Sequence, residues 1–438
     1  MSEVYPQYYS TRDAAKTQVS FEEALLAGLA PDGGLYVPTT VPEVPDADWR
    51  DAATFDDLAV NVLGHWLAGE IGAATLANLV RDALDFPVPV VLLGDDVGVL
   101  ELFHGPTLSF KDFGARTMAR LMSHFLARRG ERLTILVATS GDTGSAVADG
   151  FAGQDNIDVV LLYPKGKVSD VQERQLIVAR PGVRAFAVEG SFDDCQRLVK
   201  AAFVDPELAH LPLSSANSIN IGRLLPQSLY YLWAARSYET APLICVPSGN
   251  LGNLTGGVLA SRMGLGVPRF LVAHNANDFF PRYLDARAEA YAFRDTVATL
   301  SNAMDVGAPS NFERLDALVG AETMRDELRG SSISDEATRA RMAEVYRHEH
   351  YLACPHTAVG LEAIARYRQQ SGDDRPVLNL ATAHPAKFPD AFREALGLEP
   401  PTDPALDQLW QQDVAVEPLT PSLDVFREVL LDTVEVSS

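Results

Sequence analysis

Lys111 is the side chain in this 438-residue sequence whose setting best suits a nucleophile. It lies in HGPTLSFKDFG (104–114), between Phe110 and Phe113 and just before an expected helix. Apolar neighbours and a helix N-terminus both disfavour a positive charge, so they lower the pKa of the lysine and favour the neutral amine that attacks carbonyls. A single lysine near a helix start is more commonly an ordinary exposed side chain.

Two glycine-containing turns are suited to binding anions. ATSGDTGSA (138–146) and VPSGNLGNLTGG (246–257) each join a strand to a helix, whose first N–H groups are free to bind a carboxylate or phosphate. The second turn has four glycines, which let the backbone approach a ligand closely. It matches neither a Walker loop nor the GxGxxG pattern, and each turn alone is equally consistent with a plain helix cap.

A further polar segment, SSANSINIGR (214–223), contains Asn217, Ser218 and Arg223. An arginine can bind an anion through two parallel hydrogen bonds, so this segment is a candidate second anion site. The commoner interpretation of such a string is a polar loop with an exposed arginine.

The segment LATAHPAKF (380–388) places Thr382 and Lys387 after the last apolar strand. Ligands of open parallel sheets bind beyond the carboxyl ends of strands. We therefore expect these residues near a cleft, although Thr382 would serve equally well in a simple turn.

Strands and helices alternate along the chain from about residue 102. An apolar stripe with helical spacing predicts a helix over 112–129, and the continuous apolar run Leu133–Ala138 predicts a buried strand. Similar strands are expected at 157–164, 183–190, 243–246, 269–274 and 377–382. Continuous apolar strands alternating with helices predict an α/β fold with open parallel sheets covered on both faces.

The length of the chain favours two or three domains. We expect an N-terminal extension (1–100), a smaller α/β domain (101–230) that contains Lys111, and a larger α/β domain (231–438) that contains the glycine-rich turn. Within the extension, SFEEALLAGLAPDGGLYVP (20–38) predicts a helix capped by Ser20, then a turn and a short strand.

The net charge of −23 disfavours nucleic acid and anionic membrane surfaces as partners. The three cysteines are widely spaced and form no CxxC pair, which favours a reducing compartment. The N-terminus lacks the pattern of a secretory signal, and no apolar run has the length of a membrane span. These features predict a cytoplasmic protein.

One cluster could be read as a metal site: His348, His350, Cys354 and His356 are close in sequence and are zinc-binding residue types. Their spacing fits no standard zinc finger, and His348 and His350 do not share a helical face. We therefore expect no metal, with structural zinc as the alternative.

In this order, the segments resemble the threonine synthase family, pyridoxal-phosphate enzymes of the tryptophan synthase β-like fold (fold type II). The similarity extends from YYSTR (8–12) to HPAKFP (384–389), and the specific part is the combination of HGPTLSFKDFG, ATSGDTG and PSGNLGN. The resemblance implies that Lys111 forms the Schiff base with pyridoxal 5′-phosphate.

The resemblance also implies a role for each residue that matches a family motif. The cofactor contacts would be Lys111, Asp142 at the ring oxygen, Thr382 at the ring nitrogen, and a phosphate cup of Gly249, Asn250, Leu251, Gly252 and Asn253. The substrate contacts would be Ser140, Gly141 and Thr143 at the carboxylate, and Asn217, Ser218 and Arg223 at the phosphate.

The implied activity is that of a lyase, which converts O-phospho-L-homoserine and water to L-threonine and phosphate in the last step of threonine biosynthesis. Alternatives are another fold type II enzyme, such as a serine/threonine dehydratase, and a non-catalytic phosphate-binding protein.

Two residues depart from the family pattern. Asp142 replaces a frequent asparagine and needs either a shared proton or a nearby cation, and Cys354 stands where an acidic residue is expected. The sequence predicts no oligomeric state.

Overall fold

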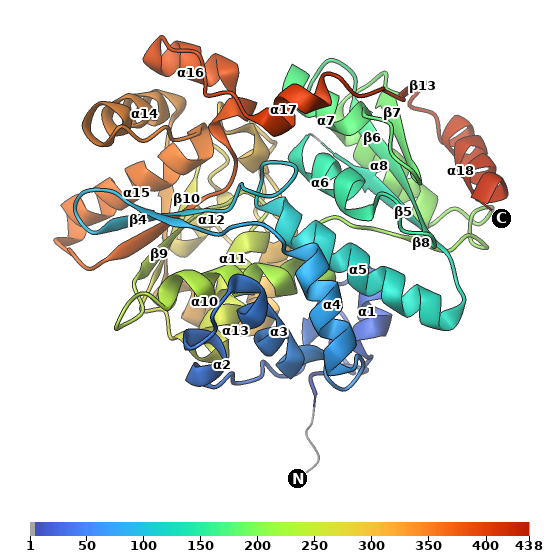
Figure 1. Ribbon diagram of the computed structural model, residues 1–438, viewed down its shortest axis with the longest axis horizontal. Coiled ribbons are helices and arrows are strands. Elements are labelled where there is room, and N and C mark those ends of the chain that lie inside the picture. The colour runs from blue at the N-terminus through green and yellow to red at the C-terminus, as the bar shows by residue number, and fades with distance from the viewer. Residues whose placement is uncertain (1–4, 140, 438) are drawn as a thin grey trace.

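Two sheets, of six and five strands, form the frame of the computed structural model, which describes residues 5–139 and 141–437 (Figure 1). The six-stranded sheet has the order β11 (Leu328–Ser332), β10 (Phe270–His274), β9 (Leu243–Pro247), β12 (Val377–Ala381), β4 (Val97–Glu101) and β3 (Val90–Leu92). Its strands are parallel except β3, which is antiparallel to β4.

The five-stranded sheet is parallel throughout. Its order is β13 (Glu417–Leu419), β7 (Val183–Val188), β6 (Ile157–Pro164), β5 (Leu133–Ala138) and β8 (Leu213–Ser214). A separate antiparallel pair, β1 (Tyr8–Ser10) and β2 (Tyr36–Pro38), lies near the N-terminus.

Helices cover the faces of these sheets (Figure 1). Those of the N-terminal region are α1 (Phe21–Ala27), α2 (Asp46–Arg50), α3 (Phe55–Leu67) and α4 (Ala73–Ala83). The central ones are α5 (Lys111–Arg129), α6 (Asp142–Phe151), α7 (Asp170–Ile177), α8 (Phe192–Phe203), α9 (Ile221–Leu224), η1 (Leu225–Ser228), α10 (Leu229–Ala235), α11 (Gly252–Ala260), η2 (Ser261–Leu265) and α12 (Phe279–Leu284). The remainder are η3 (Asn302–Met304), α13 (Asn311–Glu327), α14 (Asp335–Glu349), α15 (Pro355–Ser371), η4 (Pro385–Lys387), α16 (Pro389–Leu396), α17 (Pro404–Leu409) and α18 (Leu423–Ser437).

The predicted α/β fold with parallel sheets is confirmed, and several elements have nearly the predicted bounds. The strand predicted at 133–138 is β5, and the helix predicted from residue 112 begins one residue earlier, at Lys111. Ser20 caps α1, as predicted, and it forms a reciprocal capping box with Glu23. Among the described residues, no helix is both long and apolar enough to cross a bilayer.

Each sheet combines strands from distant parts of the chain. β3 and β4 precede residue 102 but complete the sheet of the C-terminal half, where Val97 pairs with Val377. β13 lies near the C-terminus and pairs with β7. The predicted domain boundaries at 100/101 and 230/231 stay a prediction, and the strands of each sheet do not divide at those positions.

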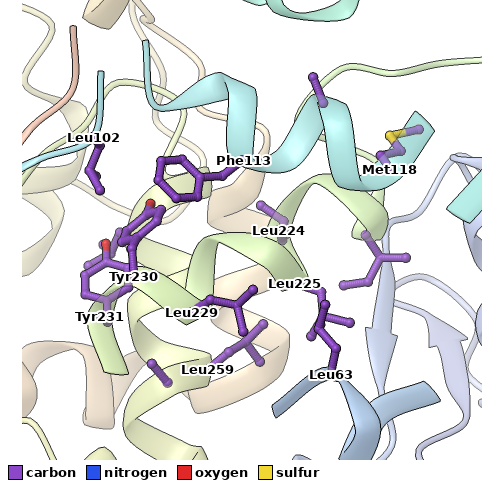
Figure 2. Close-up of a cluster of buried hydrophobic side chains, with 14 of the residues drawn as sticks. Leu63, Leu102, Phe113, Met118, Leu224, Leu225, Leu229, Tyr230, Tyr231 and Leu259 are labelled. Atoms are coloured by element: carbon purple, nitrogen blue, oxygen red, sulfur yellow. The ribbon is translucent and has the colours of Figure 1, made fainter. Parts of the chain in front are cut away.

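The largest apolar core packs the N-terminal helices and α5 against α9, η1 and α10. Figure 2 shows Phe113 of α5 next to Tyr230 of α10, and their rings meet edge to face at 5.2 Å. Figure 1 shows α1 to α4 beneath α5 and α10 in the same region. The N-terminal region therefore supports the helix that begins with Lys111.

Candidate active site

Most of the predicted site residues surround one cavity of about 690 Å³. Those that line it are Lys111, Asp142, Thr143, Asn217, Ser218, Arg223, Gly249, Asn250, Gly252, Asn253 and Thr382. They come from the starts of α5 and α6, the loop and first turn of α11, the loop before α9, α9 itself and the residue after β12. Segments far apart in sequence thus converge on one volume.

Lys111 reaches this cavity because its loop pairs with the segment after β12. The N–H of Phe110 donates to the carbonyl of Thr382 at 2.9 Å, and Ser109 forms a β-bridge with Ala383. α5 therefore starts beside Thr382, which is itself buried at 6% exposure. The side chain of Lys111 is 14% exposed, and burial lowers its pKa to about 8.

Asp142, the first residue of α6, is the carboxylate nearest to Lys111 in the described part of the chain. Its Oδ2 lies 3.9 Å from Lys111 Nζ, and its Oδ1 accepts from Lys387 Nζ at 2.8 Å. Burial favours a neutral carboxyl, but the two lysines outweigh it, and the pKa of Asp142 lies well below its usual range. An aspartate at this position needs either a shared proton or a nearby cation, and the structure provides the cation, Lys387.

The turn before α6 is built around Thr139 and Gly141. The hydroxyl of Thr139 accepts from the N–H groups of Gly141 and Gly144, at 3.1 and 2.8 Å. Gly141 has φ of 140°, where a Cβ would also meet the side chain of Gln172 at 2.6 Å, so only glycine fits. Thr143 lines the cavity, whereas Gly141 does not, and Ser140 lies outside the described residues.

The glycine-rich loop 248–253 leads into α11. Hydrogen bonds of its own side chains stabilise its conformation. Asn253 Oδ1 accepts from Ser248 Oγ at 2.6 Å, and Asn253 Nδ2 donates to the carbonyl of Pro247 at 2.8 Å. A Cβ on Gly249 would lie 2.7 Å from Met304 Cα. Leu251 has φ of 61° and points into the core rather than lining the cavity.

This loop is suited to bind the phosphate of pyridoxal 5′-phosphate, the cofactor that the sequence resemblance implies. Its backbone bends at Leu251 and presents the N-terminus of α11 to the cavity, which is the arrangement that binds a phosphate. No acidic side chain lies among its residues 248–253.

Arg223 lies on α9 and is 2% exposed. Its Nη1 donates to the carbonyl of Ala216 at 2.6 Å, while its Nε has no hydrogen-bond partner among the described residues. That Nε lies against Gly114 of α5, whereas Arg223 as a residue lines the cavity, where its charge favours an anion. Burial lowers the pKa of Arg223 to about 10, which leaves it charged at neutral pH.

Several residues at the cavity were not assigned a role from the sequence. His356, at the start of α15, lines the cavity, and its Nε2 accepts from the N–H of Ala303 at 3.2 Å. Residues 302–308 and Ser310 also line the cavity. Lys387 was expected only near a cleft, and its ion pair with Asp142 brings together residues 245 positions apart, a contact that no local pattern encodes.

Arg314 supports the loop before α9, which carries Asn217 and Ser218. Its fully buried side chain donates to the carbonyls of Tyr36 at 3.0 Å and Ile219 at 2.6 Å. It thereby joins β2 to the loop that carries Ser218.

The alternative zinc cluster is divided between two environments. His348 and His350 are exposed at the end of α14, whereas Cys354 and His356 are buried at the start of α15. Nowhere in residues 5–139 and 141–437 do three or more histidine, cysteine or acidic side chains form a group that could hold a metal ion. Cys354 Sγ instead lies 3.3 Å from Thr357 Oγ1, in the apolar core beneath α15.

Comparison with known proteins agrees with this geometry. The profile described as "Pyridoxal-phosphate dependent enzyme" matches residues 92–382, and the profiles "Threonine synthase N terminus" and "Threonine synthase, C-terminal" match residues 7–84 and 357–430. The threonine synthase of Serratia marcescens is 43% identical over 398 residues, which cover 89% of this chain and 91% of that protein.

The chain belongs to the threonine synthase family. The solved structure described as PLP-bound threonine synthase from Brucella melitensis has a TM-score of 0.91 and 38% identity, and covers 98% of this chain and 99% of that one. The family, the α/β fold and the pyridoxal-phosphate cofactor are thus confirmed.

Threonine synthase activity is favoured over the dehydratase and the non-catalytic alternatives. A threonine deaminase from Solanum lycopersicum shares only 14% identity with this chain, at a TM-score of 0.54 over 75% of this chain and 95% of that one. At that identity the likeness shows the fold alone.

Proposed function

We propose that the cavity converts O-phospho-L-homoserine and water to L-threonine and phosphate, in the cytoplasm, with the residues assigned above. The observation that carries this proposal is that the half-buried Lys111, the loop with Gly249 and Asn250, and the loop with Asn217 and Ser218 line a single cavity. One anion site would hold the phosphate of the cofactor and the other the phosphate of the substrate. The three buried, free cysteines are consistent with a reducing compartment.

The loop Gly249–Asn253 and the N-terminus of α11 would hold the phosphate of pyridoxal phosphate. Thr382 would face the ring nitrogen, where a hydroxyl does not enforce protonation. Asp142 would face the ring oxygen, with its charge offset by Lys387. When bound, the cofactor supplies an aldehyde for the amine and an electron sink for charge that develops on the substrate.

Lys111 would move protons during the reaction. Once the substrate amine replaces it, its Nζ is free to remove the α proton and later a β proton. A base works best when its pKa lies near the operating pH, and the pKa of about 8 at Lys111 meets this condition. Phosphate leaves from the γ carbon, and water adds at the β carbon.

Arg223, Asn217 and Ser218 would bind the phosphate of the substrate and stabilise its charge as it departs. The placement of all three residues at the cavity supports this role. Thr143, at the start of α6, would position the substrate carboxylate, and the roles of Gly141 and Ser140 stay predictions.

The test is to incubate the purified protein, loaded with cofactor, with O-phospho-L-homoserine and to measure phosphate and threonine. We expect the two products in equal amounts, and much slower release of ammonia from L-threonine under the same conditions. Ammonia release without threonine formation would instead identify a dehydratase, and release of neither product would identify a binding protein.

A further inference from the structure

Lys387, the last residue of η4, is a fully buried lysine at 0% exposure. Its Nζ donates to the carbonyl of Thr107 at 2.9 Å and to Asp142 Oδ1 at 2.8 Å. A buried ammonium is costly unless it is paired and hydrogen-bonded, and these two contacts meet that requirement. In the roles described above, Lys387 only offsets the charge of Asp142.

The contacts of Lys387 divide the two oxygens of Asp142 between different partners. Oδ1 accepts from Lys387 and, at 3.1 Å, from Gln172 Nε2. Oδ2 is left facing Lys111 Nζ at 3.9 Å. Because Lys387 and Gln172 both donate to Oδ1, they fix the orientation of the carboxylate. Its Oδ2 therefore stays directed at Lys111.

Other charged groups surround this arrangement. Asp112 on α5 accepts from the N–H and hydroxyl of Thr107, at 2.9 and 2.5 Å, and burial raises its pKa to about 6. Arg223 on α9 adds a positive charge, and His356 on α15 stays neutral at pH 7 because burial lowers its pKa to about 4. Lys387 and Arg223 oppose a positive charge on Lys111, and Asp142 favours one.

We propose that Lys387 is a positioning residue that keeps Asp142 ionised and oriented, and that eases the loss of a proton from the nitrogen of Lys111. This inference rests on the proposed role of Lys111 as the lysine that binds the cofactor. If the ammonium of Lys387 were removed, Asp142 would face Lys111 without a second cation to offset it. The positive form of the Lys111 nitrogen would then be stabilised, because an unbalanced opposite charge at this range shifts a pKa by about 1 or more.

The test compares Lys387→Met with Lys387→Arg in the cofactor-loaded protein. The visible absorbance of the bound cofactor and kcat/KM are each followed from about pH 6 to 10, a range that brackets lysines of lowered pKa. Each pH profile has a midpoint, the pH at which half of the change is complete. In Lys387→Met we expect the midpoints of both profiles to move upward by about 1 pH unit, a tenfold change in the ionisation constant. In Lys387→Arg, which keeps the charge, the midpoints should stay near those of the wild type.

Lys165→Met is the matched control, since it removes the same charge from a side chain that is 59% exposed. It should leave both midpoints unchanged. If Lys387→Met does not fold, Lys387→Gln is measured in its place, because its amide keeps an N–H donor at this position without the charge. Midpoints that stay fixed in the uncharged variant, or that move downward, would overturn the inference.

Borohydride reduction followed by peptide mapping separates this inference from the proposed function. A label on Lys111 together with unmoved midpoints would overturn the inference and leave the proposed function standing. A label on another lysine would overturn both.

Discussion

Asn250 Nδ2 donates to Ser218 Oγ at 2.5 Å, and this hydrogen bond joins the two anion loops of the cavity. Asn250 precedes α11, in the loop assigned to the cofactor phosphate, and Ser218 precedes α9, in the loop assigned to the substrate phosphate. Asn250 Oδ1 also accepts from the N–H of Ser310 at 2.6 Å. The two phosphates would therefore bind to loops that position each other.

Replacing Lys111 with alanine tests the central assignment. We expect a folded protein that binds no cofactor covalently and forms threonine about 10³-fold more slowly, the size of effect typical for losing a general base. Circular dichroism checks the fold, and reduction with borohydride checks for the covalent bond. Threonine formation at the wild-type rate would contradict the assignment.

Arg223→Gln tests the substrate-phosphate site. Loss of hydrogen bonds to a charged group should raise the Kd for O-phospho-L-homoserine by about 100-fold, with little effect on unphosphorylated homoserine. Binding is measured through the absorbance of the bound cofactor. Arg287→Gln is the control, because Arg287 is 64% exposed and outside the cavity. Equal losses for both ligands would count against the assignment.

Gly249→Ala tests the cofactor cup. Its Cβ would lie 2.7 Å from Met304 Cα, so the loop must shift, and overpacking of this kind costs about 1–3 kcal/mol. Equilibrium dialysis should show cofactor affinity at least about tenfold weaker. Gly64→Ala in α3 is the control: nothing lies within 4 Å of its Cβ, and the affinity should not change. Unchanged affinity in Gly249→Ala would place the phosphate elsewhere.

Asp142→Asn tests the buried ion pair. It leaves the ammonium of Lys387 without a carboxylate, and breaking a buried pair from one side lowers the free energy of unfolding by about 3–5 kcal/mol. Adding Lys387→Met should recover most of that loss, since a neutral pair needs no compensation. Urea unfolding of both single variants and the double variant gives the coupling, and simple addition of the two losses would show that the pair is not coupled.

Replacing His274 with glutamine tests how the free energy of unfolding depends on pH. Burial lowers its pKa to about 4, below the ordinary value of 6.5 that it regains on unfolding. Between these values the unfolded chain binds more protons, so the free energy of unfolding falls as the pH drops from about 6.5 to 4. His274→Gln should remove up to about 3 kcal/mol of this loss in urea titrations. His348→Gln, at an exposed position, is the matched control variant.

Local patterns predicted the elements around the site well. Continuous apolar character was sufficient for β5, and the spacing of Met118, Leu121 and Met122 was sufficient for α5, because those signals depend only on which residues are buried. The glycine-rich loop and the Thr382 segment also lie at the cavity, as expected for residues that follow strands of a parallel sheet.

Pairings between distant segments could not be predicted in this way. Periodicity predicts the strand β12 but not that it lies beside β4, and Lys387 carries no local mark of its contact with Asp142. Nor does a motif show which of its members faces the ligand: within one loop, Asn250 lines the cavity and Leu251 points into the core.

The position of β13 has a consequence for folding during synthesis. β7 is paired only with β6 until residues 417–419 leave the ribosome, although most of the sheet has emerged long before. An unpaired strand edge invites association with other chains. Nascent chains truncated before β13 should therefore be more prone to aggregate than the finished polypeptide.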